Sequence, residues 1–313
     1  MKNLLRKIYP QRKPWTHKGE HGYVLIVAGS KRYSGSPVFN AMSALRAGVD
    51  LITIIGPKRA MDIAATFAPD IIAYPLEGDW LEEKHILEIL EIGKNFNSLI
   101  IGGGLGRNGK TLEVIRQIIK KINLPMVIDA DAIYALAGQR DILKNKKVVI
   151  TPHIREFEIL TGEKVLPDTS EIGHFRSQID ADMKGADQRR YPRQSACYPR
   201  QSAILKDRQE KTKKWAKKLA VTILLKGYID VISDGQKIFL NKTGSPFMTK
   251  GGFGDTLAGI CGAILARGIS PFESACAAAY INGKAGELAA QKYGEGVLAS
   301  DIFDGIHKVI KEI

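Results

Sequence analysis

The sequence predicts an α/β fold, with a central, mostly parallel sheet flanked by helices in a single domain. Short β-branched runs alternate with helix-like segments along most of the chain, which is typical of parallel α/β units. Several of these runs end in glycine, as expected for turns at the carboxyl edge of such a sheet. The chain has 313 residues, 44% of them hydrophobic, which is enough for one full core and near the upper limit for one α/β domain.

The net charge and the cysteine pattern indicate which partners and which cellular compartment to expect. The formal net charge is +13, but the excess is spread over Lys-rich segments such as 144–147 and 211–218. Such segments are typical of solvated helix faces, so we expect anionic small molecules as partners and no nucleic acid. Cys197, Cys261 and Cys276 form no CxxC pair, which indicates a reducing compartment. There is no signal peptide and no membrane-spanning apolar run, so we expect a cytoplasmic protein without a membrane partner.

The first part of the chain predicts a series of strand–turn–helix units. The expected strands and the helices between them are strands 21–29, 50–55, 71–74, 98–101 and 126–128, and helices 38–47, 59–67, 82–93 and 110–121. The strand at 98–101 runs into GGGLGRN, which places Gly102, Gly103, Gly104 and Gly106 between a strand and a helix. We favour a backbone contact with a ligand here over a loose connection, because the flanking periodicities are clear.

Two further strand ends carry side chains suited to chemistry. Asp129 and Asp131 follow the strand at 126–128; they hold a metal or a ribose hydroxyl, or else they cap the next helix, and both alternatives stay open. His153 follows a strand at 147–150, at the sheet edge where ligands bind. Glu156 is the candidate for orienting a hydrated Mg²⁺ ion, and no other metal ligand is assigned.

Residues 168–210 differ from the rest of the chain. They combine weak apolar periodicity and many charges with a tandem repeat, YPRQSA, at 191–196 and 198–203. We expect an irregular surface insertion, because a charged repeat expansion explains the Arg and Tyr content better than a nucleic-acid motif does. Regular elements then resume: a helix at 212–219, a strand at 221–225, a hairpin of 231–233 and 237–240, and closing helices at 271–286 and 299–313.

Residues 241–261, NKTGSPFMTKGGFGDTLAGIC, form a glycine-rich turn that runs into a helix. Its glycines let the backbone approach an anion, and the amides of a helix N-terminus favour negative charge. Asp255 lies in the first helical turn, where it would repel a phosphate. It is therefore either a base that takes a proton from a hydroxyl beside a phosphoryl group, or an ordinary N-terminal carboxylate.

Six motifs occur in an order and spacing similar to the carbohydrate kinase domain of the YjeF type: HGYVLIVAGSKRYSGSP, IGGGLGR, VIDADAI, ITPHIREFEIL, LLKGYIDVI and MTKGGFGDTLAGI. They span nearly all of the chain outside the insertion, and the chain resembles the ADP-dependent NAD(P)H-hydrate dehydratases, which have a ribokinase-like fold. The resemblance implies dehydration of the S-epimer of NAD(P)H hydrate (NADHX or NADPHX) to NAD(P)H, with ADP converted to AMP and phosphate. It also implies Mg²⁺ as a cofactor and a homotetramer.

The resemblance also assigns roles to residues. It implies that Asp255 is the catalytic base and that the hydrate contacts Ser36, Gly104, His153 and Asp255. The nucleotide contacts that it implies are Lys226, Gly227, Tyr228, Ile229, Asp230 and Gly254. The amides of the anion hole that it implies are those of Gly251, Gly252, Phe253 and Gly254.

Three positions depart from the family pattern: Ser36 stands for Ala, Gly103 for Pro, and Phe253 for a small Thr or Ser. The bulky Phe253 ring stands where it could crowd the phosphate, although its backbone amide remains available, and its effect stays open. The chain also begins too late to hold the N-terminal epimerase domain of many relatives, so we expect a separate epimerase to act on the same metabolite.

Two other functions remain alternatives. A vitamin or sugar kinase of the same fold would use Asp255 in the same way but release a stable phosphorylated product. A non-catalytic relative would bind the nucleotide without turnover. ADP and ATP both remain alternatives as the donor.

Overall fold

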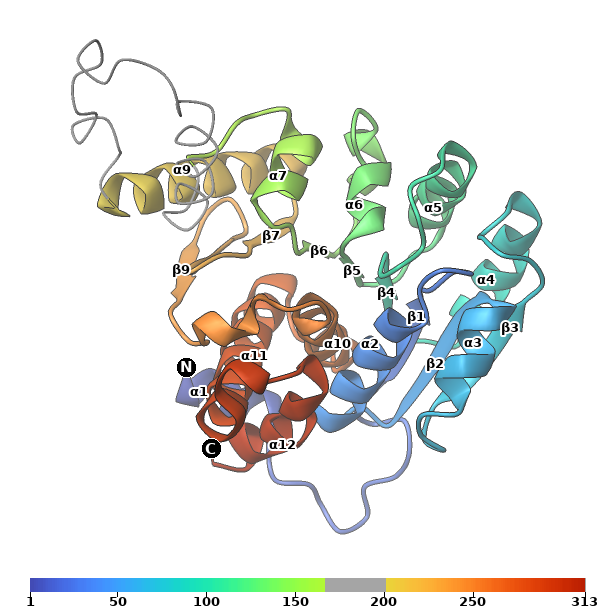
Figure 1. Ribbon diagram of the computed structural model, residues 1–313, viewed down its shortest axis with the longest axis horizontal. Helices are drawn as coiled ribbons and strands as arrows, with labels where there is room; N and C mark the ends of the chain where they lie inside the picture. Colours follow the sequence, from blue (N-terminus) through green and yellow to red (C-terminus); the bar gives the residue numbers. More distant parts are fainter. Residues whose placement is uncertain (167–200, 313) are drawn as a thin grey trace, which may run out of the picture.

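The computed structural model describes residues 1–166 and 201–312, in which nine strands form one sheet (Figure 1). The strand order is β3-β2-β1-β4-β5-β6-β7-β8-β9, and all neighbours are parallel except β7–β8 and β8–β9. The strands are β1 (Tyr23–Val27), β2 (Leu51–Pro57), β3 (Ile72–Leu76), β4 (Ser98–Ile101), β5 (Met126–Ile128), β6 (Val148–Ile150), β7 (Thr222–Leu225), β8 (Asp230–Ser233) and β9 (Ile238–Asn241). The predicted α/β fold with a mostly parallel sheet is confirmed.

The strand order reverses between β1 and β4. From β1 the chain adds β2 and β3 on one side of the sheet, and it then crosses over to add β4 to β9 on the other. Open parallel sheets bind ligands beside the carboxyl ends of the strands at such a reversal. The turns after β1 and β4 meet there, because the amide of Gly29 donates a hydrogen bond of 2.8 Å to the carbonyl of Gly103.

Helices cover both faces of the sheet (Figure 1). One face carries α1 (Lys2–Ile8), α2 (Gly35–Arg46), α3 (Lys58–Ala65), α10 (Phe253–Ala266), α11 (Pro271–Tyr293) and α12 (Phe303–Lys311). The other face carries α4 (Ile86–Gly93), α5 (Gly109–Lys121), α6 (Asp131–Ala135), α7 (Ile154–Thr161) and α9 (Gln201–Leu219).

Strand β1 shows how the sheet separates two hydrophobic layers. Val24 and Ile26 pack into one layer, whereas Leu25 and Val27 pack into the other, as the period of two in a strand requires. Because both faces are covered, strand residues are apolar without alternation, which explains the continuous apolar runs in the sequence.

The predicted irregular insertion was too long at its C-terminal end, because α9 begins at Gln201 rather than near residue 212. The buried residues Ile204, Arg208, Thr212 and Trp215 lie three or four positions apart and form one helical stripe. Because two residues of this stripe are polar, an arginine and a threonine, the apolar periodicity of a helix is not visible in the sequence. Residues 168–200 of the predicted insertion, with Cys197, lie outside the described residues.

Smaller differences concern individual helices. Helices α1 and α7 were not predicted, and α11 runs on to Tyr293. The last predicted helix divides into a 3₁₀ turn, Ala299–Ile302, followed by α12. Cys261 and Cys276 are buried and unpaired. Within residues 1–166 and 201–312, no helix has the length and apolar character needed to cross a membrane.

Candidate active site

Asp255 lies in the first turn of α10, and α2 holds it at two points. The Ser36 hydroxyl donates a hydrogen bond of 3.2 Å to Oδ2 of Asp255. The side-chain amide of Asn40 donates a hydrogen bond of 2.7 Å to the Asp255 carbonyl. The carboxylate and its backbone are therefore both fixed by a neighbouring helix.

The close approach of α2 and α10 depends on Gly259. A Cβ at this position would lie 2.0 Å from Oγ of Ser43 and 2.4 Å from the carbonyl oxygen of Asn40. Only glycine permits this separation of the helices, and the separation brings Asp255 within reach of Ser36.

The glycine turn after β4 passes directly beside this carboxylate. Gly102 has a φ of +139°, and a Cβ there would lie 1.7 Å from the carbonyl oxygen of Asp129. A Cβ at Gly103 would lie 2.7 Å from Oδ1 of Asp255, and one at Gly104 would lie 3.5 Å from Oγ of Ser36. Three of the predicted hydrate contacts, Ser36, Gly104 and Asp255, thus converge where the strand order reverses.

Lys226 connects the end of β7 with the other strand ends. Its ammonium donates a hydrogen bond of 3.0 Å to Oδ1 of Asp129, which also accepts one of 2.7 Å from the Thr151 hydroxyl. Oε2 of Glu156 lies 3.9 Å from the same ammonium. A Cβ at Gly254 would lie 3.4 Å from Nζ of Lys226. The lysine therefore stands beside the N-terminus of α10.

His153 and Glu156 form a reciprocal cap at the start of α7. The His153 amide donates a hydrogen bond of 2.9 Å to Oε2 of Glu156, and the Glu156 amide donates one of 3.3 Å to Nδ1 of His153. The His153 side chain is 49% exposed, and its Nε2 lies 3.3 Å from Oε1 of Glu156, so both ring nitrogens contact Glu156. Burial and the charge of Lys226 lower the pKa of His153 to about 4, which keeps the imidazole neutral near pH 7.

The alternative that Asp129 and Asp131 cap the next helix is wrong. The N-cap of α6 is Ala130, and no side chain caps it. Asp129 bonds to Lys226 and Thr151 instead. Asp131 accepts hydrogen bonds of 2.8 Å from the Gly106 amide and 2.6 Å from Nε of Arg107. The two acids hold the turn after β4 and the lysine after β7 in place.

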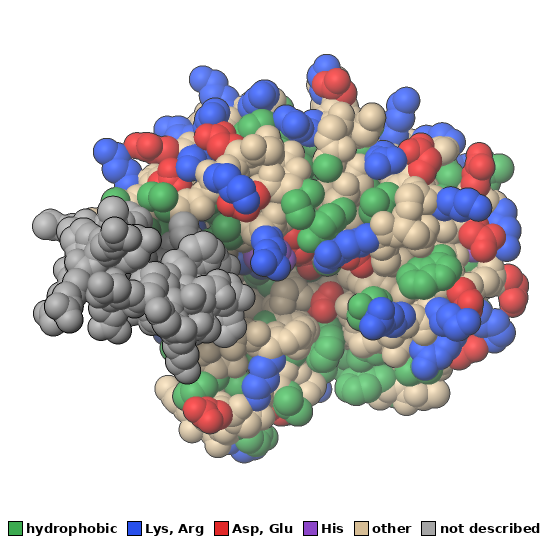
Figure 2. Space-filling view, turned by 45° about the horizontal axis from the view of Figure 1, so that its top comes forward, with side chains coloured by type: hydrophobic (Ala, Val, Ile, Leu, Met, Phe, Trp, Pro, Cys, Tyr) green, Lys and Arg blue, Asp and Glu red, His purple; other side chains and the backbone are tan. Residues whose placement is uncertain are grey.

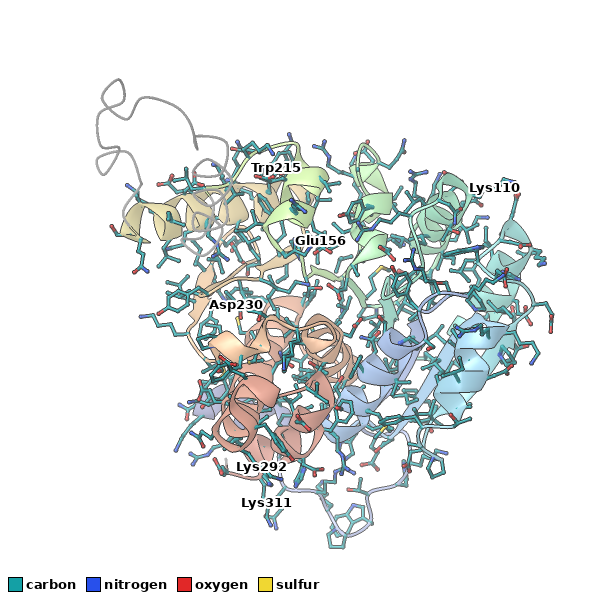
Figure 3. All side chains as sticks on the ribbon, in the orientation of Figure 1. Lys110, Glu156, Trp215, Asp230, Lys292 and Lys311 are labelled. Atoms are coloured by element: carbon teal, nitrogen blue, oxygen red, sulfur yellow. The ribbon has the colours of Figure 1, made fainter. Side chains whose placement is uncertain are left out.

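The predicted nucleotide segment forms a compact turn between β7 and β8. The Gly227 amide donates a hydrogen bond of 3.1 Å to Oδ1 of Asp230, and Nδ2 of Asn241 donates one of 3.0 Å to Oδ2. Tyr228 is 77% exposed, and Ile229 is partly exposed. Because β7 runs parallel to β6, the turn at its carboxyl end lies at the same sheet edge as the turns after β4 and β6. Figure 3 labels Glu156, at the start of α7, and Asp230, at the start of β8.

The turn at residues 251–254 is exposed at Gly251 and packed at Gly252, where a Cβ would lie 2.7 Å from Cβ of Ala299. Gly252 has a φ of +100°, and nothing lies within 4 Å of a Cβ built at Gly251. The Phe253 ring is only 5% exposed and packs into the core. The open question of this ring is answered by its burial: as the first residue of α10, Phe253 packs into the core and does not crowd the turn.

Burial and neighbouring charges set the protonation of the site. Burial, and the charge of Asp129, raise the pKa of Asp255 to about 7, against the Ser36 hydrogen bond and the Lys226 charge. Burial raises the pKa of Glu156 as well. Burial alone would lower the pKa of Lys226, but the charges of Asp129 and Glu156 raise it overall. The site holds a charged ammonium beside a carboxyl group that titrates near neutral pH.

Sequence reasoning missed two residues of the site, Asn40 and Thr151. Asn40 is 1% exposed, and a buried amide at a helical core position is the signal for it, beside Ser43 as the other buried polar residue of α2. Thr151 offered no such signal, since its bond to Asp129 depends on the pairing of β5 with β6.

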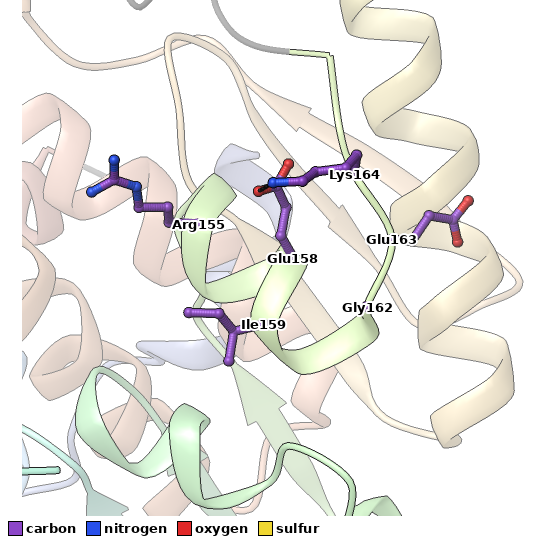
Figure 4. A pocket seen from close by; sticks show the side chains of 6 residues that line it. All are labelled: Arg155, Glu158, Ile159, Gly162, Glu163 and Lys164. Atoms are coloured by element: carbon purple, nitrogen blue, oxygen red, sulfur yellow. Dashed lines mark hydrogen bonds and ion pairs between the residues drawn. The ribbon is translucent and has the colours of Figure 1, made fainter.

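The surface carries a depression and a pocket. Figure 2 shows the depression near the middle of the face that it draws, with basic and acidic side chains along its rim. A separate pocket of about 350 Å³ lies where α7 ends and is lined by Arg155, Glu158, Ile159, Gly162, Glu163 and Lys164 (Figure 4). None of these six residues belongs to the cluster around Asp255.

Known proteins resemble this chain in sequence and in fold. The family model described as NAD(P)H-hydrate dehydratase matches residues 24–186 and 191–308. The ADP-dependent (S)-NAD(P)H-hydrate dehydratase of Cenarchaeum symbiosum is 35% identical over 98% of this chain and 94% of its own length. The bifunctional NAD(P)H-hydrate repair enzyme Nnr of Pyrobaculum aerophilum is 39% identical over 96% of this chain.

The chain spans about half the length of the bifunctional relatives that it matches, 52% in the Pyrobaculum enzyme. Among solved structures, the ADP/ATP-dependent NAD(P)H-hydrate dehydratase of Bacillus subtilis, co-crystallised with ATP and Mg²⁺, aligns with a TM-score of 0.74 at 24% identity. The alignment covers 100% of this chain and 97% of that one. A ribokinase-like superfamily protein of Enterococcus faecalis aligns with a TM-score of 0.75 at 22% identity, covering 100% and 94%. These structures support the ribokinase-like fold.

Proposed function

Because the chain belongs to the NAD(P)H-hydrate dehydratase family, we propose that it dehydrates the S-epimer of NADHX or NADPHX with ADP as the phosphoryl donor. The observation that carries the proposal is the position of Asp255. Its carboxyl group lies at the N-terminus of α10, beside Ser36 and the glycine turn after β4. A base for a hydroxyl and a set of amides for a phosphate thus stand together.

In the first step, Asp255 takes the proton of the hydrate hydroxyl. The hydroxyl oxygen forms a bond to the β-phosphorus of ADP, while the bond from that phosphorus to the bridging oxygen breaks and AMP leaves. A pKa of about 7 suits this role, because a large share of Asp255 is ionised near neutral pH yet still basic.

In the second step, the bond between the ring carbon and the phosphorylated oxygen breaks. Phosphate leaves with the electron pair, and the neighbouring ring carbon gives a proton to the departing phosphate, which restores the double bond of NAD(P)H. Hydroxide is a poor leaving group and phosphate is a good one, so phosphoryl transfer makes the dehydration possible. Asp255 then returns its proton to water.

The remaining predicted site residues contact the hydrate, the nucleotide or the transferring phosphoryl group. The hydrate contacts Ser36, Gly104, His153 and Asp255, and the neutral, half-exposed His153 ring adds no positive charge there. The nucleotide lies along residues 226–230 and at Gly254. The amides of residues 251–254 and the Lys226 ammonium together stabilise the transferring phosphoryl group.

Magnesium, when bound, neutralises the phosphates of the donor. Asp129, Glu156 and Asp255 surround the single ammonium of Lys226, so the site keeps a negative charge that suits a cation. In the described ranges, no three His, Cys, Asp or Glu side chains are grouped as a metal cluster. Glu156 would therefore hold the hydration shell of a nucleotide-bound ion, as magnesium sites commonly require.

The homotetramer and the separate epimerase stay predictions. The same holds for the choice between NADHX and NADPHX.

The proposal is tested by adding ADP and NADHX, or NADPHX, to the protein and following the nicotinamide absorbance. We expect the absorbance to return, with one AMP formed for each NAD(P)H. A stable phosphorylated compound without the return of absorbance would establish the kinase alternative. Binding of ADP without turnover would establish the non-catalytic alternative.

A further inference from the structure

Arg208 is a charged side chain that neither the sequence motifs nor the proposed function uses. It lies in the middle of α9 and is only 2% exposed. Helix α9 packs against β7 and β8, the two strands that flank the turn at residues 226–230 (Figure 1). Arginine is rarely buried to this degree unless its charge and donors are used.

The guanidinium of Arg208 reaches the turn between β7 and β8. Its Nη2 donates hydrogen bonds of 3.1 Å to the carbonyl of Lys226 and of 3.4 Å to that of Leu225. A Cβ at Gly227 would lie 2.3 Å from Nη2, 2.4 Å from Nη1 and 2.7 Å from Cζ. Because the two terminal nitrogens are nearer than Cζ, the Nη1–Nη2 edge of the planar group points at Gly227. The absence of a side chain at Gly227 makes room for it.

The same charge acts on Asp230, which closes the turn from its other end. Burial raises the pKa of Asp230, and its hydrogen bonds together with the charges of Arg208 and Lys226 oppose this rise. An arginine from α9 thus supports a turn whose first residue, Lys226, faces Asp129.

A purely stabilising role explains this arrangement poorly. Replacing a buried charge by an apolar side chain of similar volume is often neutral or stabilising, so stability alone does not require an arginine here. The planar fork of Arg208 does what an apolar side chain does not: it fixes the direction of two successive carbonyls, and with them the amides and the side chain that follow.

We propose that Arg208 is a positioning residue for nucleotide binding, which holds residues 226–230 in the conformation that receives the phosphates and the adenosine of ADP. This inference rests on the proposed role of residues 226–230. Arg208 itself does not contact the ligand. Tight binding of the nucleotide therefore requires that α9 pack against β7 and β8.

The test compares Arg208→Met and Arg208→Lys with a matched control in the same helix, Leu219→Ala. Leu219 is 7% exposed and offers no side-chain donor. For each protein we would measure the Kd of ADP by calorimetry, the KM values of ADP and of the hydrate, and the unfolding midpoint.

Arg208→Met should raise the Kd and the KM of ADP by about 10-fold or more, since donors from a charged group are lost, and change the KM of the hydrate by less than about 2-fold. Arg208→Lys keeps the charge without the fork, so we expect a smaller rise in both values for ADP. Leu219→Ala should lower the unfolding midpoint and leave the affinity for ADP unchanged.

Two outcomes would overturn the inference while leaving the proposed function intact: wild-type affinity for ADP in both Arg208 variants, or an equal rise in both KM values. If Arg208→Met does not fold, Arg208→Lys is used instead. A rise in the KM of ADP relative to the KM of the hydrate supports the inference, and an unchanged ratio of the two overturns it. A wild-type protein that neither binds nor consumes ADP would instead overturn the proposed function, and this inference with it.

Discussion

At the scale of the residue, the chemistry depends on the pKa of Asp255, which burial and a hydrogen bond from α2 determine. Burial raises the pKa of this carboxyl group to about 7, and the Ser36 hydroxyl opposes the rise by donating to the ionised form. The base is active when ionised, so kcat/KM should increase with pH through the pKa and then level off. The stability of the fold changes in the opposite direction. Because the pKa of Asp255 is raised in the folded protein, the free energy of unfolding falls as the pH rises from about 4 to about 7.

Ser36→Ala should therefore move the inflection of kcat/KM to higher pH. The substitution removes the hydrogen bond that stabilises the carboxylate, so a higher pH is needed to ionise Asp255. The enzyme should remain active, since the base itself is intact. Ser34→Ala is the matched control, because Ser34 makes no side-chain cap at the start of α2. An inflection that stays in place or moves downward in Ser36→Ala would contradict this account of the base.

At the scale of the element, the site depends on the close packing of α2 against α10. Gly259 permits it, and Asn40 then reaches the first turn of α10. That turn is also held from α11, where Asn282 accepts a hydrogen bond of 2.8 Å from the Thr256 hydroxyl. Two neighbouring helices thus fix the turn that carries Asp255.

Gly259→Ala should separate these helices. The added methyl group meets the backbone of Asn40, which has no freedom to move aside, so we expect a loss of about 1–3 kcal/mol in the free energy of unfolding. We also expect kcat to fall, because Ser36 and Asp255 move apart. Denaturant unfolding and turnover assays measure the two effects.

The control for this prediction is Gly109→Ala, at the exposed start of α5, where nothing lies within 4 Å of the added Cβ. It should keep full activity and gain a few tenths of a kcal/mol, because alanine favours the helix. Equal stability of Gly259→Ala and the wild type would show that the two helices do not need this glycine.

At the scale of the whole molecule, much of the fold was predictable because it follows from local patterns. Continuous β-branched runs mark strands covered on both faces, and glycines mark the turns at their carboxyl ends. Asp255 at the start of a helix was predicted in the same way. What the sequence did not reveal depends on pairing between distant segments. The bond from Lys226 to Asp129 requires β5, β6 and β7 to be neighbours, and the stripe of α9 contains Arg208 where a leucine would have made it visible.

The central claim is that Asp255 deprotonates the hydrate while ADP gives up its β-phosphoryl group. The most direct measurement is AMP formation from ADP at about pH 8, with and without the hydrate, by the wild type and by Asp255→Asn. The account predicts that the wild type forms AMP only when the hydrate is present. It also predicts that Asp255→Asn binds ADP normally but forms AMP about 10²- to 10⁴-fold more slowly. Formation of AMP by Asp255→Asn at the wild-type rate would contradict it.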